Sequence, residues 1–503
     1  MRFGWFPVLV VALLGTAALG QEPARRPNLV LFLVDDLGWQ DVSVPFHTER
    51  TPFNARYRTP NLERLAQRGL KFTQAYASAP VCTPTRTSIL TGRSPGQTHV
   101  TFWTLHKDTD TSAAFPGLEP PAWNVNALQP EDVTLPRLLR DSGYRTIHVG
   151  KAHFGAVGTP GADPCNLGFD VNIAGHGAGG PGSYYGRNDF SAAHRGGDHV
   201  WDVPGLDAYH GRDVYLTEAL TAEALKAVDA AVAERRPFYL HFAPYAVHTP
   251  IEADPRYLEH YEGLDPREAA YATMIEGVDA ALGALMADLE RLGVDDETVI
   301  VFTSDNGGLS AHARGGQAHT HNTPLRSGKG SAYEGGIRVP LVVAFPGAPR
   351  AGESEAMPVI SHDLFPTFLA LSGTELPRTY ASSVEGLDLG PLVRGEGSLP
   401  ARALFWHQPH FWGVRGPGIW PFSAVRRGDW KLIWRHADRG FELYHLASDV
   451  GEAVDLAPYE PQKVRELAGE LGAWIERVDA QLPIDGRTRK PVAAPNREAA
   501  SGR

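Results

Sequence analysis

The chain has 503 residues, of which 43% are hydrophobic and 21% are charged. This length and composition are typical of a globular protein with a sizeable core, and they allow one large α/β domain with a smaller companion. The formal net charge of -11 argues against a protein that coats nucleic acids or other polyanions, so we expect no nucleic-acid partner. A single basic pocket for one anionic group remains compatible with that charge.

Residues 1–20 have the pattern of an export signal. Arg2 supplies a positive charge, residues 5–14 are mostly apolar, and residues 18–20 are mostly small, as expected before a cleavage site. The apolar run is short for a membrane span, and no later run approaches that length. We therefore expect an exported protein, periplasmic or secreted, without a stable membrane anchor. An uncleaved N-terminal anchor is the alternative.

Strand and helix patterns alternate along residues 28–371. Apolar and β-type runs predict strands at 28–34, 70–76, 144–149, 238–243, 298–303 and 339–345. Helical patterns fall between them, at 60–68, 134–142, 213–236, 272–292 and 362–371. Because strand, helix and strand recur in this order, we expect an α/β fold with a large, mainly parallel sheet flanked by helices.

Two insertions rich in Gly and Pro, at about 94–129 and 155–211, interrupt this alternation and are expected to be functional loops. Near residue 397 the pattern changes, and three short strands at 422–425, 430–434 and 441–444 precede a helix at 461–478. We expect a large domain over 21–396, a smaller α+β domain over 397–485, and a disordered polar tail over 486–503.

Polar side chains follow two of the predicted strands directly. Asp35 and Asp36 come after the first strand, and Asp305 and Asn306 come after the strand at 298–303. Ligands of open α/β sheets bind beyond the carboxyl ends of the strands, and these oxygen donors suit Ca²⁺ or Mg²⁺ better than zinc. The alternative is that each pair caps the next helix or turn. Two such pairs at equivalent strand ends favour a metal site.

The chain has two cysteines, Cys82 and Cys165. Pro84 favours a helix start that places Cys82 at the helix N-terminus, where free N–H groups attract anions and activate a thiol. A disulfide between the two cysteines is the alternative in an exported protein. A small buried cysteine is a second alternative, which the polar neighbours of Cys82 disfavour.

The residues around Cys82 carry a specific motif. Cys82-Thr83-Pro84-Thr85-Arg86 resembles the C-x-P-x-R signature of the type I sulfatases, which belong to the alkaline phosphatase superfamily, and the Thr-Gly-Arg continuation follows at 91–93. Thr at position 85 is a mild departure from the usual Ser or Ala. The resemblance continues in order over roughly residues 27–478, through segments at 150–153, 248–250, 304–307, 322–336 and 427–444.

The resemblance implies an alkaline phosphatase-like fold and the hydrolysis of sulfate esters. In that family a formylglycine-generating enzyme converts the motif cysteine, here Cys82, to formylglycine, whose hydrate is the nucleophile. Carried over to this chain, the resemblance implies a Ca²⁺ ion, with Mg²⁺ less favoured, held by Asp35, Asp36, Asp305, Asn306 and the modified residue 82.

The resemblance also implies roles for charged side chains of the matched motifs. Arg86 is expected to steady the attacking hydroxyl, and Lys151 and Lys329 to neutralise sulfate oxygens. His248, with Lys329, is expected to protonate the leaving alcohol. His153 is expected to take a proton from the second hydroxyl of the hydrate, so that the aldehyde reforms and sulfate leaves.

Aromatic and histidine side chains suggest the substrate class. His99 and Trp103 lie in the first insertion, and His407 lies in an aromatic stretch at 405–412. Because aromatic faces with polar edges suit sugar rings, we hypothesise a sulfated carbohydrate that contacts these residues as well as Lys151, His248 and Lys329. Packing between the domains is the alternative for any one of these aromatic residues.

Other functions fit parts of the same pattern. A phosphate or phosphonate monoester hydrolase of the same superfamily would use the same metal geometry. A non-catalytic protein that binds sulfated glycans would follow if Cys82 stays unmodified. An enzyme with a thiolate nucleophile is also conceivable, although it would not need four oxygen ligands for a metal nearby.

Overall fold

The computed structural model describes residues 26–121, 126–309 and 322–500, together with residues 1 and 4. The export signal expected over 1–20 therefore lies almost wholly outside the described residues. Among the residues that are described, no helix combines the length and the apolar character that a membrane crossing requires.

A nine-stranded sheet forms the centre of the large domain. Its order is β10-β2-β8-β7-β1-β6-β4-β5, with β9 paired to β2. The strands are β1 (Asn28–Val34), β2 (Leu70–Tyr76), β4 (Arg145–Gly150), β5 (Val171–Ile173), β6 (Phe238–Ala243), β7 (Thr298–Ser304), β8 (Arg338–Ala344), β9 (Ser354–Glu355) and β10 (Val359–Ile360). The mainly parallel sheet is thus confirmed, with one exception: β8 runs antiparallel to both β7 and β2.

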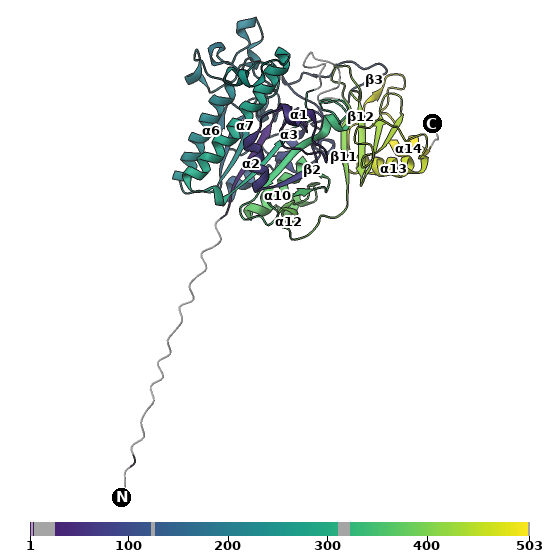
Figure 1. The fold of residues 1–503 in the computed structure, drawn as a ribbon. Coiled ribbons are helices and arrows are strands. Elements are labelled where there is room, and N and C mark those ends of the chain that lie inside the picture. The colour runs from purple at the N-terminus through teal and green to yellow at the C-terminus, as the bar shows by residue number, and fades with distance from the viewer. Residues whose placement is uncertain (2–3, 5–25, 122–125, 310–321, 501–503) are drawn as a thin grey trace.

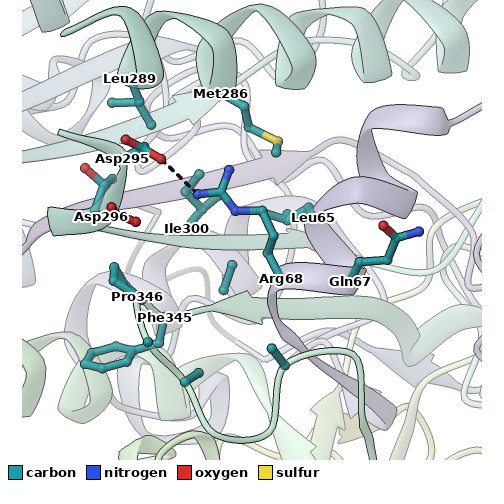
Figure 2. Close-up of a pocket in the computed structure, with 15 residues that line it drawn as sticks. Leu65, Gln67, Arg68, Met286, Leu289, Asp295, Asp296, Ile300, Phe345 and Pro346 are labelled. Carbon is teal, nitrogen blue, oxygen red and sulfur yellow. Dashed lines mark hydrogen bonds and ion pairs between the residues drawn. The ribbon is translucent and has the colours of Figure 1, made fainter. Parts of the chain in front are cut away.

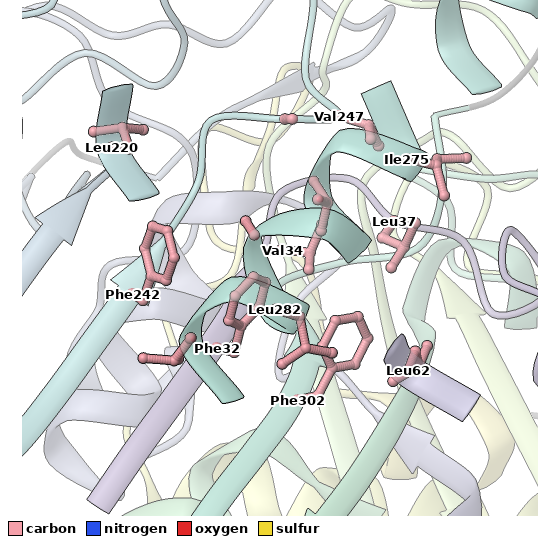
Figure 3. Close-up of a cluster of buried hydrophobic side chains, with 14 of the residues drawn as sticks. Phe32, Val34, Leu37, Leu62, Leu220, Phe242, Val247, Ile275, Leu282 and Phe302 are labelled. Atoms are coloured by element: carbon pink, nitrogen blue, oxygen red, sulfur yellow. The ribbon is translucent and has the colours of Figure 1, made fainter. Parts of the chain in front are cut away.

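Helices cover both faces of this sheet because β1 and its neighbours are apolar on both sides. Val30, Phe32 and Val34 belong to a buried cluster with residues of α2 (Pro60–Arg68), α6 (Leu216–Ala233) and α7 (Pro266–Leu292), three helices that Figure 1 labels. Figure 3 shows Phe32 and Val34 in this cluster together with Leu62, Leu220 and Leu282 of these helices. The alternate residues of β1 face α3 (Cys82–Thr91), α5 (Leu135–Asp141) and α10 (Leu364–Ser372). Shorter helices are α1 (Pro52–Arg56), α4 (Pro95–Thr98), α9 (Glu334–Ile337), α11 (Arg378–Ala381) and α12 (Gly390–Val393).

The smaller C-terminal domain lies at one side of the molecule (Figure 1). Its antiparallel sheet has the order β11-β12-β13-β14, and α13 (Pro461–Arg477) packs on it through Leu467 and Leu471. The strands are β11 (Ala403–Gln408), β12 (Phe422–Arg427), β13 (Trp430–Arg435) and β14 (Phe441–His445). The α+β character is confirmed. The sequence analysis missed β11 because its aromatic residues were interpreted as a binding surface.

The C-terminal tail corrects one expectation. Residues 486–500 are ordered in the structure: Val492 is buried against α13, and α14 (Pro495–Ala500) follows it. Just before them, β15 (Ile484–Asp485) pairs with β3 (Leu118–Glu119) of the first insertion. The prediction of a disordered tail is therefore wrong over 486–500, because a polar composition concealed one buried valine and a strand pair.

A buried ion cluster joins the two domains. The Lys431 ammonium of β13 lies 2.8 Å from Glu452 Oε1 and 3.0 Å from Glu334 Oε1, and all three side chains are fully buried. Tyr76 donates a hydrogen bond of 2.6 Å to Glu334 Oε2. Burial alone would raise the pKa of Glu334, but Lys431 and neighbouring arginines outweigh it and lower that pKa. At Glu452, burial prevails over Lys431 and raises the pKa.

We expect Lys431→Met to destabilise the protein by about 3–5 kcal/mol, because removing the cation takes from buried Glu452 its described ion-pair partner and leaves buried Glu334 paired with Arg338. The measurement is the free energy of unfolding from urea titration. The control is Lys226→Met, which removes a surface ion pair with Glu223 in which the lysine is 67% exposed. A loss at Lys431 no larger than at Lys226 would contradict the assigned role.

Candidate active site

Three acidic side chains meet at the carboxyl end of the central strands. Val34 of β1 is in register with Ser304 of β7, so the residues that follow them, Asp35 and Asp305, lie side by side. The carboxylates of Asp35, Asp36 and Asp305 are fully buried, with oxygens within 4.8 Å of one another. The backbone N–H of Asp36 donates to Asp305 Oδ1 at 3.2 Å, which links the segments that follow the two strands.

Each of these carboxylates has its own buried cation. Lys151 Nζ, at the end of β4, lies 2.7 Å from Asp35 Oδ2. Lys329 Nζ lies 2.7 Å from Asp36 Oδ1. From α3, Arg86 Nε lies 2.7 Å from Asp305 Oδ2. The three cations come from separate segments of the chain. They therefore meet only after the sheet and the elements around it have folded.

Burial and the cations oppose each other in the titration of this cluster. Burial would raise the pKa of Asp36 and of Asp305, but Lys329 and Arg86 outweigh it and hold both pKa values below the ordinary range. At Asp35, burial prevails over Lys151 and raises the pKa well above its ordinary value. A bound cation would favour the charged form of Asp35.

Two oxygens of the cluster are suited to a metal ion. Asp35 Oδ1 and Asn306 Oδ1 are buried and accept no hydrogen bond from any described residue. The amide nitrogen of Asn306 donates to Asp36 Oδ1 at 2.8 Å, which leaves its carbonyl oxygen free to bind a cation. Buried oxygens of this kind cost free energy unless a donor or a cation satisfies them. The donor set therefore fits a hard divalent ion, as the sequence predicts.

The position of Cys82 agrees with the expected helix start. Cys82 is the first residue of α3, after Val81 in extended conformation, and its side chain is 3% exposed. Arg86 lies one turn further along the same helix face, where it pairs with Asp305, so α3 links Cys82 to the acidic cluster. Both cysteines are free, and Cys165 is exposed, so the alternative of a disulfide between them is wrong.

The two candidate catalytic histidines differ in which nitrogen is free. His153 Nε2 lies 2.7 Å from the carbonyl oxygen of Thr104 and donates to it, which leaves Nδ1 without a partner among the described residues. Burial lowers the pKa of His153 well below its ordinary value, so this ring is neutral. His248 Nδ1 donates to its neighbour Thr249 O at 2.8 Å, and Nε2 lies 3.8 Å from Asp36 Oδ2.

The two members of the expected proton-donor pair, Lys329 and His248, have pKa values shifted in opposite directions. Burial, together with Lys329, lowers the pKa of His248 to about 3. Burial would lower the pKa of Lys329 too, but the carboxylate of Asp36 outweighs it and raises that pKa above the ordinary value. The raised pKa favours the ammonium form of Lys329, which lies at the edge of the cluster and lines the cavity described next.

A cavity of about 310 Å³ lies over these residues. It is lined by Cys82, His153, His248 and Lys329, together with Val81, Trp103, Gly179, Trp201, Thr249, Leu309, Trp412 and Val414. Of the three residues predicted to set specificity, Trp103 lines the cavity, whereas His99 and His407 do not. Their rings bind backbone carbonyls elsewhere, at Asp479 and Gln481. These two histidines therefore hold the C-terminal domain together and attach the first insertion to it.

Of the other two tryptophans of this cavity, Trp201 was not predicted, and Trp412 was predicted only as part of the aromatic stretch at 405–412. Trp201 lies in the second insertion, and Trp412 follows β11. For Trp201 the available signal was its position in an insertion that was already expected to be functional. Such a signal does not indicate the direction of the side chain.

A second cavity has a similar volume, about 300 Å³, but different chemistry (Figure 2). It lies at the opposite end of the central strands from the acidic cluster, where β7 begins. Arg68 pairs with Asp295 there, at 3.3 Å. The described residues that line it include neither the acidic cluster nor a cysteine, so the cavity over Cys82 is the candidate active site.

Comparison with known proteins decides the family. The family model described as Sulfatase matches residues 27–374. The chain belongs to the sulfatase family. A second model, described as N-sulphoglucosamine sulphohydrolase, C-terminal, matches residues 328–481. The resemblance stated from the motifs is thereby confirmed, and with it the assignment as a sulfuric ester hydrolase of the alkaline phosphatase superfamily.

Similar proteins cover nearly the whole chain. A protein named Sulfatase from Formosa agariphila is 28% identical over 98% of this chain and 97% of its own. Arylsulfatase A of Homo sapiens is 32% identical over 93% of this chain and 89% of its own. The crystal structure of Ps i-CgsB in complex with k-i-k-neocarrahexaose is 27% identical, covers 91% of this chain and 94% of that one, and has a TM-score of 0.71. The sulfatase fold therefore extends over both domains.

Two glycines of the second insertion lie against the active-site imidazoles. A Cβ at Gly179 would lie 2.5 Å from His153 Cε1, and a Cβ at Gly180 would lie 2.8 Å from His248 Nδ1. Contacts under 3 Å require a shift, so this backbone sets how far each ring can move.

We expect Gly179→Ala to lower kcat for sulfate ester hydrolysis by about tenfold or more, because the added methyl group displaces the His153 ring from its position. Stopped assays of sulfate release measure this loss. The control is Gly469→Ala on α13, where a Cβ meets no atom within 4 Å. An unchanged kcat in a folded Gly179→Ala protein would refute the close contact.

Proposed function

We propose that this chain is an exported sulfatase that hydrolyses sulfate esters of a carbohydrate, with a formylglycine at position 82 and a bound Ca²⁺ ion. The observation that carries the proposal is the buried cluster of Asp35, Asp36 and Asp305, which α3 links to Cys82 through Arg86. A cysteine in the C-x-P-x-R motif beside hard oxygen ligands fits this chemistry better than a thiolate enzyme, which needs no such metal site.

Calcium is favoured over magnesium by the composition of the site. Its protein ligands would be the oxygens of Asp35, Asp36, Asp305 and Asn306. Mg²⁺ prefers to keep several waters in near-ideal octahedral geometry, whereas Ca²⁺ accepts a cage of protein oxygens. When bound, the ion supplies a Lewis acid for a sulfate oxygen and favours the ionised form of the attacking hydroxyl.

The residues around the cavity divide the proton transfers between them. Lys329, which carries a proton, donates it to the oxygen of the leaving alcohol, assisted by His248. His153, whose Nδ1 has no other described partner, accepts the proton of the second hydroxyl at position 82. The first hydroxyl oxygen at position 82 would bond to sulfur as the bond from sulfur to the alcohol oxygen breaks. Loss of the proton from the second hydroxyl would then break the bond from carbon to the sulfated oxygen, so that the aldehyde reforms and sulfate leaves without an attack of water on sulfur. Lys151 and Lys329 stabilise the charge that develops on the sulfate oxygens.

Two further points support the substrate class and the location. Ps i-CgsB, a relative described above, was solved with a carbohydrate in complex, and the cavity of this chain has tryptophans in its wall.

The export pattern over residues 1–20 supports a periplasmic or secreted enzyme that meets a formylglycine-generating enzyme during maturation. Fractionation of producing cells tests the location, and activity confined to the cytoplasm would contradict it.

We expect peptide mass spectrometry across residue 82 to detect formylglycine in active protein. We also expect Cys82→Ser to lower kcat by about 10³-fold or more, because a serine cannot form a geminal diol. The matched control is Cys165→Ser, which changes the other, exposed cysteine. An intact thiol in inactive protein that still binds sulfated glycans would favour the binding protein instead. Faster turnover of a matched phosphate ester than of the sulfate ester would favour the phosphohydrolase.

We expect chelation to remove most of the activity and Ca²⁺ to restore it more fully than Mg²⁺. Asp305→Asn should raise the Ca²⁺ concentration needed for half-restoration by about tenfold or more, because it removes a charged ligand. Asp213→Asn, whose side chain is 90% exposed, is the control. Full activity after exhaustive chelation, checked by metal analysis, would contradict the metal site.

A further inference from the structure

The wall of the cavity over Cys82 is built from three tryptophans that belong to three different segments. Trp103 comes from the first insertion, Trp201 from the 3-10 helix His199–Trp201 of the second insertion, and Trp412 from the C-terminal domain. All three are half-buried, so each has one part packed on the protein and another part facing the cavity. Three aromatic faces around one opening favour a ring as the group next to the sulfate.

The positions of two of these tryptophans are fixed by close backbone contacts. A Cβ at Gly330 would lie 2.5 Å from Trp412 Cε3, so the indole lies directly on the backbone beside Lys329. Lys329 Nζ lies 5.8 Å from the centroid of the same ring. The backbone carbonyl of Trp201 accepts a hydrogen bond of 2.6 Å from the N–H of Gly182. The Trp412 ring and the backbone of Trp201 are therefore held in place before a substrate binds.

The described wall of the cavity carries little charge. Among the described residues of the lining, Lys329 carries the one permanent charge, and its ammonium already pairs with Asp36 at 2.7 Å. The described lining contains no carboxylate and no arginine. A second sulfate or a carboxylate on the bound ring would lose its hydration without meeting a counter-charge among the described lining residues, and this loss costs free energy.

The size of the cavity limits how much of the substrate enters. Its volume of about 310 Å³ is near the lower end of the range for ligand pockets, which is about 300–1,000 Å³. It accommodates one six-membered ring with its sulfate, and a chain of several rings would extend outside.

We propose that this cavity selects one neutral pyranose ring that carries a single sulfate, and that Trp201 and Trp412 determine this specificity. The inference rests on the proposed sulfatase function and narrows its substrate class. A sulfated uronic acid and a hexosamine with two sulfates are the substrates that the wall disfavours.

The experiment compares singly and doubly charged sugars on the mature enzyme. The probes are galactose 4-sulfate and galactose 6-sulfate, glucosamine with N- and 6-O-sulfates, and 4-nitrophenyl sulfate, whose turnover reports the sulfatase chemistry alone. We expect kcat/KM for the better galactose sulfate to exceed that for the doubly sulfated sugar by about tenfold or more. Turnover of the aryl ester with equal or better turnover of the doubly charged sugar overturns the inference while the proposed function stands.

A binding measurement separates the inference from catalysis. In the Cys82→Ser background, calorimetry measures Kd for the same sugars without turnover. We expect Trp201→Ala and Trp412→Ala to raise Kd for galactose sulfate by about tenfold, and Trp201→Phe to restore most of the affinity. Tyr459→Ala, which removes an aromatic residue that is 77% exposed, is the control. Unchanged Kd in both alanine variants, or tighter binding of the doubly charged sugar, overturns the inference.

Discussion

Three buried carboxylates, each paired with a buried cation, form the constraint on which the rest of this structure depends. Charges in a protein interior are costly unless their partners are held at close range. Arg86 reaches the cluster from α3, Lys151 from the end of β4, and Lys329 from the connection after β7. The site is therefore stable only when the sheet, α3 and that connection are all in place. The same packing that buries the core thus also determines the position of the nucleophile.

The order of strands and helices could be predicted from the sequence because apolar runs and helical periodicity are local signals. The direction of a strand is not local, and nothing within residues 338–344 indicated that β8 runs against its neighbours. Helix starts were also uncertain. The pattern suggested a start at Asp213, but α6 begins at Leu216, and the Asp213 side chain is 90% exposed. A residue type that favours a helix start, such as Asp, occurs at several positions, and tertiary contacts determine at which of them the helix begins.

The site itself could be predicted in part, for a physical reason. Asp35 and Asp305 follow strands that are neighbours in the sheet, so a simple rule about strand ends brings them together. Trp201 lies in a long loop, where no periodicity fixes its orientation, and it was missed. His99 and His407 were expected near the substrate because of their residue types, but both rings bind backbone carbonyls of the C-terminal domain. Residue type alone does not separate a binding surface from a domain contact.

The reversed direction of β8 has a consequence for how such an enzyme can diversify. Since β7 ends and β8 begins at the same end of the sheet, the connection between them starts and finishes at the end that carries the acidic cluster. Lys329 lies on that connection and pairs with Asp36, so a change of its length would displace a cation of the acidic cluster even where every strand pair stays intact. Its two ends also carry Asp305 and Glu334, one for chemistry and one for domain attachment. A change of substrate preference that arises there must therefore preserve the buried charge pairs at both ends of the connection.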